Sequence, residues 1–270
     1  MKKPVLKESV LDLQGRVATI TFGRDDVRNA LTGTALVEDI LETLAWVNRD
    51  EDVSVLILTG GGSAFSSGGN VREMSERGGI FDGSVQQIQD QYRRGIQRIP
   101  HAMEAAEVPL IAAINGPAIG AGFDLACMCD LRLASGTAVM GETFVNLGII
   151  PGDGGAWFLQ RLVGYQRAAE LTLTGRLVSA EEALSLGIVL EVTEQDKLLG
   201  RAIELAAQIA SKPPRAVRLT KRLLKHAQRG TLSDCLDLSA CFQGMAHHTD
   251  DHVEAINAFL EKRTGVYSGT

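Results

Sequence analysis

Cysteine is scarce in this sequence, and no apolar run in it is long enough to cross a bilayer. The four cysteines include Cys127 and Cys129, whose spacing turns them to different faces of a helix and excludes a metal clip of the usual kind. We therefore expect free thiols in a reducing, cytoplasmic compartment, and no metal site. The first residues lack the apolar core of a signal peptide, so we also expect no membrane partner.

Basic residues are outnumbered by acidic ones. The chain has 27 lysine and arginine residues against 33 aspartate and glutamate residues, which gives a formal net charge of −6. This balance argues against a nucleic-acid partner. A composition of 45% hydrophobic and 22% charged residues is that of an ordinary globular protein. A length of 270 residues fits one large α/β domain with an appended helical part.

Glycine, in contrast, is abundant, and one cluster of it follows a short apolar run at the centre of the chain. The run Leu110–Ile114 predicts a buried strand, which Asn115–Pro117 ends. Gly120 and Gly122 then allow a tight turn, after which the apolar spacing becomes helical. Asp124 therefore lies in the first turn of a helix, close to N–H groups that have no partner within the helix. A strand, a glycine turn and a helix N-terminus together can hold a negative charge.

Two further segments of the chain have glycine turns after apolar runs. Val53–Leu58 predicts a second buried strand and leads into Gly60–Asn70, which lacks the Gly-Lys-Ser/Thr ending of a phosphate-binding P-loop. A dinucleotide fingerprint is also absent, because Leu125 stands where its third glycine belongs. The third turn, Gly148–Gly155, opens a helix that contains Trp157. Such turns can aim backbone N–H groups at one anionic oxygen, as in an oxyanion hole.

The remaining pattern predicts an α/β core followed by helices. Val17–Phe22 alternates as a half-buried strand does, and Thr34 is the expected cap of the next helix. Residues 72–90 show little periodicity and are interpreted as a mobile lid, followed by one helix over Gln91–Glu107. Strand patterns then stop, and four amphipathic helices end the chain: Leu198–Ser211, Pro214–Gln228, Leu232–Met245 and Asp250–Lys262.

Five segments, taken in order, resemble the crotonase superfamily, also called the enoyl-CoA hydratase/isomerase family. They are Ala64–Asn70, Asn115–Asp130, Leu147–Gly155, Thr174–Val189 and Ala258–Arg263, and the resemblance covers nearly the whole chain. It implies an α/β fold, a crotonase-like spiral of β-β-α units with a C-terminal helical region. We expect residues 1–197 to form this core with the CoA and acyl site. Residues 198–270 would serve oligomerisation, in a homotrimer or a dimer of trimers, and complete the CoA site.

The resemblance also implies a substrate and a set of site residues. The substrate would be an acyl-CoA thioester, with no cofactor. Its enolate oxygen would be stabilised by two backbone N–H groups, which by position come from Ser67 and Ala121. One preorganised donor of this kind is worth roughly 3 kcal/mol of barrier. Further contacts to the substrate would come from Asn29, Ala30, Leu31, Ala64, Ser66, Gly68, Gly69 and Gly120, and from Phe259 and Lys262 of the C-terminal helix, possibly that of a neighbouring subunit.

The sequence departs from the family pattern at one acid. Hydratases of the family use two glutamates; the first corresponds to Asp124, but the second corresponds to Phe144, which cannot transfer a proton. Asp153, in a glycine-flanked turn, is favoured over Glu142 as a replacement, although a turn-forming aspartate needs no catalytic role. Phe144 would then line the acyl pocket beside Trp157, and such an apolar pocket would raise the pKa of Asp124 or Asp153.

The leading prediction is an acyl-CoA enzyme of the enoyl-CoA hydratase/isomerase type, with Asp124 as acid/base. An isomerase, thioester hydrolase or decarboxylase that uses a single carboxylate is the nearest alternative. A non-catalytic acyl-CoA-binding protein is the alternative from another class.

Overall fold

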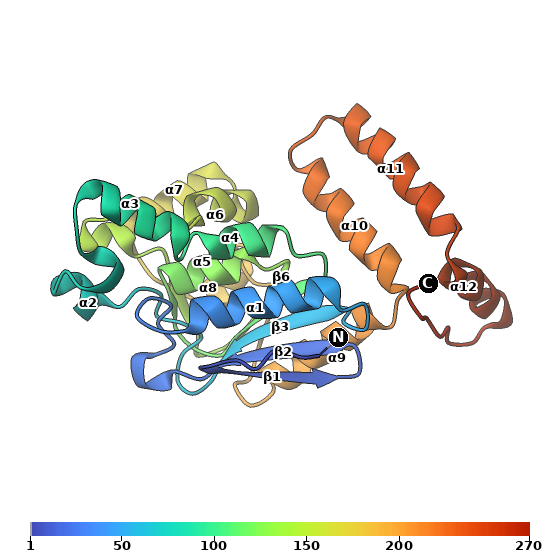
Figure 1. The fold of residues 1–270 in the computed structure, drawn as a ribbon, viewed down its shortest axis with the longest axis horizontal. Coiled ribbons are helices and arrows are strands. Elements are labelled where there is room, and N and C mark those ends of the chain that lie inside the picture. Colours follow the sequence, from blue (N-terminus) through green and yellow to red (C-terminus); the bar gives the residue numbers. More distant parts are fainter. Residues whose placement is uncertain (1) are drawn as a thin grey trace.

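Two sheets form the core of the computed structural model, which describes residues 2–270 (Figure 1). The larger sheet has the order β1-β2-β3-β4-β6-β9, with β1 antiparallel to β2 and the other pairs parallel. Its strands are β1 (Ser9–Gln14), β2 (Val17–Phe22), β3 (Val55–Gly60), β4 (Leu110–Ile114), β6 (Leu131–Ser135) and β9 (Glu191–Thr193). The smaller sheet has the order β5-β7-β8, from β5 (Ala118–Ile119), β7 (Val139–Gly141) and β8 (Val178–Ser179).

The larger sheet is covered on both faces, which explains why its central strands are continuous apolar runs. Helix α1 (Leu36–Arg49) packs on one face, and α9 (Leu198–Ala210) packs on the other, as Figure 1 shows above and below the strands. Every residue of β4 is buried. Because β2, β3 and β4 are parallel, their carboxyl ends lie at the same edge of the sheet, and the loops that follow them meet there.

The other helices lie around and beyond this core. Helices α2 to α8 surround the carboxyl edge of the sheet, and α10 to α12 extend away from the core, with α10 and α11 side by side (Figure 1). The first group comprises α2 (Val71–Ser75), α3 (Val85–Arg94), α4 (Arg98–Glu104), α5 (Ala121–Met128), α6 (Gly155–Val163), α7 (Tyr165–Thr174) and α8 (Ala180–Ser185). The second comprises α10 (Pro214–Ala227), α11 (Leu232–His247) and α12 (Asp250–Glu261), and short 3₁₀ turns occupy Asp25–Val27, Gly79–Phe81 and Phe144–Leu147.

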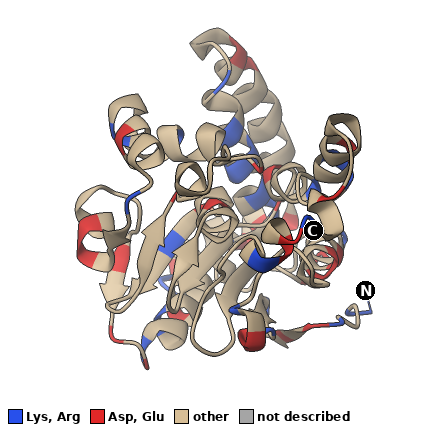
Figure 2. Cartoon of the chain, turned by 90° about the vertical axis from the view of Figure 1, so that its left-hand side faces the viewer, with Lys and Arg blue, Asp and Glu red and all other residues tan. Residues whose placement is uncertain are grey.

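Lysine and arginine side chains attach helix α10 to the core by donating hydrogen bonds to backbone carbonyls, some of them at the ends of other helices. It carries lysine and arginine but no acid, and blue positions follow one helix in Figure 2. Arg218 donates to the carbonyls of Val47, Asp50 and Val53 at 3.0–3.1 Å, at the end of α1. Buried Lys221 donates to the Val108 carbonyl at 2.7 Å. These bonds satisfy carbonyls that a helix end and a loop leave without partners, and they fix where the C-terminal helices leave the core.

Several expectations from the sequence are confirmed and others are wrong. The strands around Val17–Phe22 and Leu110–Ile114 are as predicted. The single helix over Gln91–Glu107 is wrong: the chain breaks at Gly95, where a Cβ would lie 2.7 Å from the Gln91 carbonyl oxygen. Residues 72–90 contain most of α2, a 3₁₀ turn and the start of α3 rather than an irregular lid.

The start of α1 and the start of the helices that leave the core also differ from what the sequence predicts. Ala35, not Thr34, is the N-cap of α1, and its N–H donates to the Glu8 carboxylate at 2.5 Å, a long-range cap that local sequence does not reveal. Helix α9 buries Leu198, Ala202 and Ala206 against the sheet, so the helices that leave the core begin after α9 rather than at residue 198.

Asn29 clamps two of the loops at the carboxyl edge together. Its fully buried side chain donates to the carbonyls of Ala64, at 2.8 Å, and Gly61, at 3.0 Å, and accepts the Arg24 N–H at 2.9 Å. Its own φ is +54°, in the left-handed region that asparagine tolerates better than most residues. The Ser66 hydroxyl donates to the Asn29 carbonyl at 2.7 Å. The loop after β2 therefore sets the shape of the loop after β3.

We expect Asn29→Ala to lower the free energy of unfolding by about 2–4 kcal/mol, because buried carbonyls lose their donors and alanine resists the positive φ. Urea unfolding measures this. Asn29→Gly is the matched control: it loses the same hydrogen bonds without the backbone strain, so it should be more stable than the alanine variant by about 1 kcal/mol. Equal stability of wild type and Asn29→Ala would show that the clamp is unimportant.

Candidate active site

Three loops converge where the parallel strands end. Isolated parallel bridges pair Ala30 with Gly68 and Ser66 with Ala118, and the Leu31 N–H donates to the Gly68 carbonyl at 2.7 Å. The loop after β3 thus lies between the loop after β2 and the segment that leads into α5. Ala64 and Ser66 are buried within this junction.

The junction presents free backbone N–H groups. Gly120, with φ +53°, turns the chain into α5, and the N–H of Ala121, its first residue, has no hydrogen-bond partner among residues 2–270. The N–H of Gly69 is also without a partner in this part of the chain. Gly68 brings the two segments together, since a Cβ on it would lie 2.7 Å from the Ala121 nitrogen. Two donors therefore remain available at the start of a helix.

Ser67 does not supply the expected donor. Its N–H donates to the Arg28 carbonyl at 2.9 Å, and its hydroxyl donates to the Val27 carbonyl at 3.2 Å. These bonds hold the loop, so the free N–H of the glycine turn is that of Gly69, two residues later.

Three buried carboxyl groups lie beside these donors. Asp124 comes from the first turn of α5, Glu142 from the residue after β7, and Asp153 from the turn before α6, and all three are at most 4% exposed. The Gly155 N–H donates to Asp124 Oδ2 at 3.1 Å. A Cβ on Gly155 would lie 2.2 Å from Glu142 Oε1 and 2.3 Å from Asp124 Oδ1. Only glycine leaves room for the cluster.

The pKa values of the three carboxyl groups are raised because burial disfavours their charged forms. Burial raises the pKa of Asp124 well above its usual range, and repulsion from Asp153 and Glu142 raises it further. Burial raises the pKa of Glu142 to about 7 and also raises that of Asp153, while hydrogen bonding from Asp124 opposes both shifts. The cluster therefore retains at least one proton near neutral pH.

Apolar residues surround the cluster. The Phe144 ring lies 3.6 Å from the position of a Cβ on Gly120, next to the free donors. A narrow apolar gap, too small to admit a water molecule, adjoins Asp153 and Ala121, and its other lining residues are Leu31, Ile96, Ile99, Pro100, Leu125 and Met128. Tyr92 packs against Gly152 of the same turn, and the nearby charge of Asp153, together with burial, raises the pKa of the phenol.

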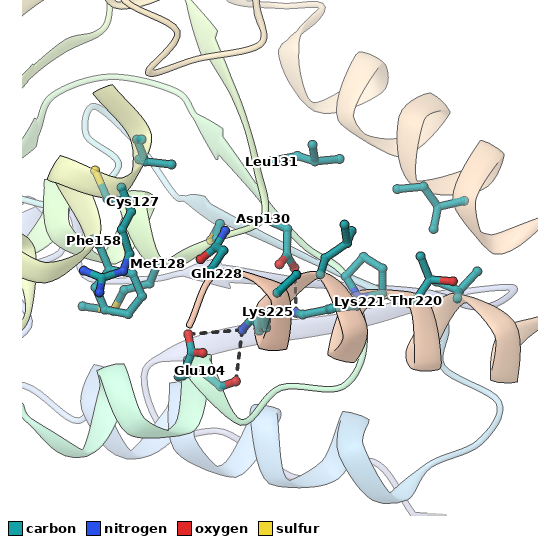
Figure 3. A pocket seen from close by; sticks show the side chains of 18 of the residues that line it. Glu104, Cys127, Met128, Asp130, Leu131, Phe158, Thr220, Lys221, Lys225 and Gln228 are labelled. Atoms are coloured by element: carbon teal, nitrogen blue, oxygen red, sulfur yellow. Dashed lines mark hydrogen bonds and ion pairs between the residues drawn. The ribbon is translucent and has the colours of Figure 1, made fainter. Parts of the chain in front are cut away.

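Trp157 lies elsewhere, which corrects the expectation that it lines the acyl pocket beside Phe144. Arg161 stacks on its ring at 3.7 Å, and both line a separate cavity of about 870 Å³ between α5, α6 and α10. Figure 3 shows this cavity, with Lys221 directed at Asp130 and Lys225 at Glu104. Its cations are thus engaged in holding α10.

Phe259 and Lys262 lie at the far end of the C-terminal helices. Phe259 is 82% exposed on α12, which lies at the edge of Figure 1, well away from α5. They do not complete the site of their own chain. Within residues 2–270, no three His, Cys, Asp or Glu side chains are placed to hold a metal ion, and no helix is long and apolar enough to span a membrane.

Free N–H groups and buried carboxyl groups of raised pKa together form a candidate site that can hold an anionic oxygen and transfer protons. Comparison with known proteins then places the chain. A family model described as enoyl-CoA hydratase/isomerase matches residues 12–270. The chain belongs to the enoyl-CoA hydratase/isomerase family of the crotonase superfamily, and it is an acyl-CoA-processing enzyme of that family. The resemblance inferred from the sequence is confirmed.

Known relatives are similar to this chain over almost its full length. The chain is 35% identical to the short-chain-enoyl-CoA hydratase of Clostridium acetobutylicum over 96% of each chain, and 34% identical to the crotonyl-CoA hydratase of Syntrophomonas wolfei, covering 94% and 95%. The crystal structure of enoyl-CoA hydratase from Bacillus anthracis superposes with a TM-score of 0.91 at 36% identity, covering 98% of this chain and 100% of that one. The crotonase-like α/β fold is therefore also confirmed.

Burial of Glu142 predicts a specific pH dependence of stability. Its pKa is higher in the folded state, about 7, than the ordinary value of 4.5, so folding retains a proton that the unfolded chain loses. The stability due to this group is therefore present below pH 4.5 and is lost as the pH rises towards 7. Glu142→Gln should be increasingly more stable than wild type over this range, by on the order of 3 kcal/mol at pH 8.

Urea unfolding at pH 4.5 and pH 8 measures the difference. Glu181→Gln on α8 is the matched control, because its side chain is exposed, and it should show no such growth. A Glu142→Gln variant whose advantage is the same at both pH values would contradict the prediction.

Proposed function

We propose that this protein catalyses proton transfer at the α- or γ-carbon of an acyl-CoA thioester, through an enolate held by backbone donors. The observation that carries this proposal is that the free N–H of Ala121 and the carboxyl of Asp124 lie in the first turn of α5, against which Gly68 packs the loop that presents the free Gly69 N–H. Ala121 and Asp124 are three residues apart on α5, so they share one face of the helix. The proposal replaces Ser67 by Gly69 as the second donor.

The backbone donors stabilise the charge that develops on the thioester oxygen. Each preorganised donor contributes roughly 3 kcal/mol, and the N-terminus of α5 adds its dipole. Because both donors are main-chain groups fixed by the loop junction, they need no reorganisation when the charge appears. Asp124 then serves as acid/base at the carbon next to the thioester, and Asp153 as a second carboxyl beside it.

The same geometry supports a set of contacts between the protein and the acyl-CoA substrate. The side chains of Asn29 and Ser66 are buried and bonded within the loop junction, so contacts to CoA from Asn29, Ala30, Ala64 and Ser66 would be made by their backbone. Leu31 lies in the same apolar surroundings as Ala121 and Asp153 and would contact the acyl group. Gly68 and Gly120 allow the close approach, and Phe144 makes the far wall of the site apolar.

The relatives' names favour addition of water to a 2-enoyl-CoA. Phe144, however, supplies no carboxyl beside Gly120, and the carboxyls of Asp124 and Glu142 meet at Gly155 instead. This specific arrangement favours a second candidate, migration of the double bond between the 2- and 3-positions, which needs proton transfer but no activated water. Both reactions would proceed through the same enolate, held by the same backbone donors.

We further propose a homotrimer or a dimer of trimers in the cytoplasm. The exposed apolar residues Leu232, Leu236, Phe259 and Leu260 on α11 and α12 support an assembly that covers them. In such an assembly, Phe259 and Lys262 would serve the CoA site of a neighbouring subunit. The free cysteines of the chain support a reducing compartment.

The test is incubation with a short 2-enoyl-CoA and a short 3-enoyl-CoA in D₂O, with products followed by mass. We expect hydration or double-bond migration with deuterium at carbon, and a loss of at least 100-fold in kcat for Asp124→Asn, since the amide cannot accept the proton. Asp196→Asn is the matched control, because this aspartate is exposed and outside the site.

The products separate the candidates. Hydrated 2-enoyl ester establishes the hydratase, and double-bond migration with deuterium uptake but no hydration establishes the isomerase. Release of free CoA would show thioester hydrolysis instead. Binding of the esters without any turnover, unchanged in Asp124→Asn, would refute the proposal in favour of an acyl-CoA-binding protein.

A further inference from the structure

Met128, in the last turn of α5, separates two apolar spaces of very different size. The smaller is the narrow gap beside Ala121 and Asp153, which does not admit a water molecule. The larger is the cavity of about 870 Å³ between α5, α6 and α10, and Figure 3 shows Met128 in its lining. Within residues 2–270, Met128 is the one residue that lines both spaces. Its side chain is only 5% exposed, so it fills the wall between them.

Helix α5 leads from the free backbone donor to this wall. Ala121, Leu125 and Met128 are four and three residues apart, so they lie on one face of the helix, and all three line the gap. The rise of an α-helix makes this face about 10 Å long. An extended chain gains roughly 1.2 Å per bond, so a twelve-carbon acyl chain is longer than the face. Such a chain, with its thioester oxygen at the Ala121 N–H, would have to pass Met128.

The other side chains around the gap offer no way out of it. Leu31, Ile96, Ile99 and Leu125 are all buried and belong to the main hydrophobic core. Close packing of such a core resists displacement by a ligand. Truncating one of them would leave a closed hole in the core, whereas truncating Met128 would join the gap to a space that is already open.

Phe158 of α6 forms the neighbouring part of the wall. A Cβ on Gly154 would lie 3.2 Å from its ring and 3.4 Å from the Cβ of Pro100, which lines the gap. The Phe158 ring lines the larger cavity and packs edge to face on Trp157, with the ring centroids 4.6 Å apart. The ring contact holds Phe158 in place, whereas Met128 has a flexible, unbranched side chain. Met128 is therefore the side chain whose size decides whether the two spaces connect.

The larger cavity has the chemistry to hold the end of an acyl chain. Lys221 in its lining pairs with Asp130 at 2.6 Å, and Lys225 pairs with Glu104 at 3.5 Å, so these charges compensate one another. Burial raises the pKa of the Cys127 thiol, which therefore stays uncharged. The lining is predominantly apolar and includes Leu131, Phe158, Leu162, Val217 and Leu224.

We propose that Met128 limits the length of the acyl group, and that the substrate of this enzyme is a thioester of CoA with a short acyl chain. This inference rests on the proposed function. With Met128 in place, an acyl group held at the Ala121 N–H ends at a gap that is already filled. With a smaller residue at position 128, the gap opens into the cavity behind it, and a longer chain is accommodated there.

The first experiment compares kcat/KM for enoyl-CoA esters of four and twelve carbons, counting every product. We expect wild type to favour the four-carbon ester at least 100-fold. Met128→Ala should raise the ratio of the twelve-carbon to the four-carbon value at least 10-fold over wild type. Met128→Leu conserves the side-chain volume and should keep the wild-type ratio. If Met128→Ala does not fold, Met128→Val takes its place, with a smaller rise.

Met103→Ala is the matched control. Met103 is fully buried in the core and lines neither space, so the same truncation there should leave the ratio unchanged. Unfolding curves establish that each variant is folded. An equal rise in Met103→Ala would show that loosening of the core, rather than the junction at Met128, admits the long chain, and would overturn the proposal.

The second experiment measures binding without turnover. Trp157 lines the larger cavity, whereas Trp46, the second tryptophan of the sequence, does not. Dodecanoyl-CoA should therefore change the fluorescence of Met128→Ala beyond the change that butanoyl-CoA causes, and Trp157→Phe should remove this difference. In wild type, dodecanoyl-CoA should bind at least 10-fold more weakly than butanoyl-CoA.

The two experiments distinguish the failures. An unchanged ratio in Met128→Ala, or a wild type that turns over both esters equally, overturns the length limit and leaves the proposed function intact. A wild type that turns over neither ester counts against the proposed function, and the fluorescence titration then tests the limit alone. Equal binding of dodecanoyl-CoA and butanoyl-CoA to wild type would overturn the limit there.

Discussion

The site depends on the burial of three carboxyl groups around one glycine. Asp124, Glu142 and Asp153 come from three separate elements, and only glycine at position 155 leaves the space in which Asp124 and Glu142 meet. Their mutual repulsion and loss of hydration oppose folding, so the surrounding structure must hold them rigidly. The same loss of hydration, reinforced by repulsion at Asp124 and Glu142, raises their pKa values, and a carboxyl with a pKa near neutrality can both give and accept a proton. The buried carboxyl cluster therefore lowers the stability of the fold at the position where its raised pKa values favour proton transfer.

The fold supplies the rigidity in two ways. The parallel strands end at one edge of the sheet, where three loops follow them. Hydrogen bonds from the buried side chains of Asn29 and Ser66 hold these loops together. On the opposite side, the cations of α10 hold the C-terminal helices against the ends of α1 and α4. The core and the C-terminal helices thus meet through polar contacts rather than through the site, which leaves the carboxyl cluster undisturbed.

The sequence predicted the parts of the structure that local patterns determine. Apolar runs located β2, β3 and β4, and the glycine turn after β4 placed Asp124 in the first turn of α5. The short strand β9 escaped notice, because three residues form no recognisable period. Gly95 ended a helix that periodicity alone would continue.

Tertiary contacts determine the rest of the site. The choice between Ser67 and Gly69 as donor depends on the Arg28 carbonyl, about 40 residues earlier in the chain, which no spacing reveals. Extended geometry would put Glu142 and Phe144 on one face, but β7 ends at Gly141 and a 3₁₀ turn begins at Phe144, so the two side chains diverge. Glu142 turns towards Asp124 while the Phe144 ring turns towards Gly120. The carboxyl of Glu142 and the ring of Phe144 therefore lie against different glycines, Gly155 and Gly120, so Glu142 does not take the place of a carboxyl at position 144.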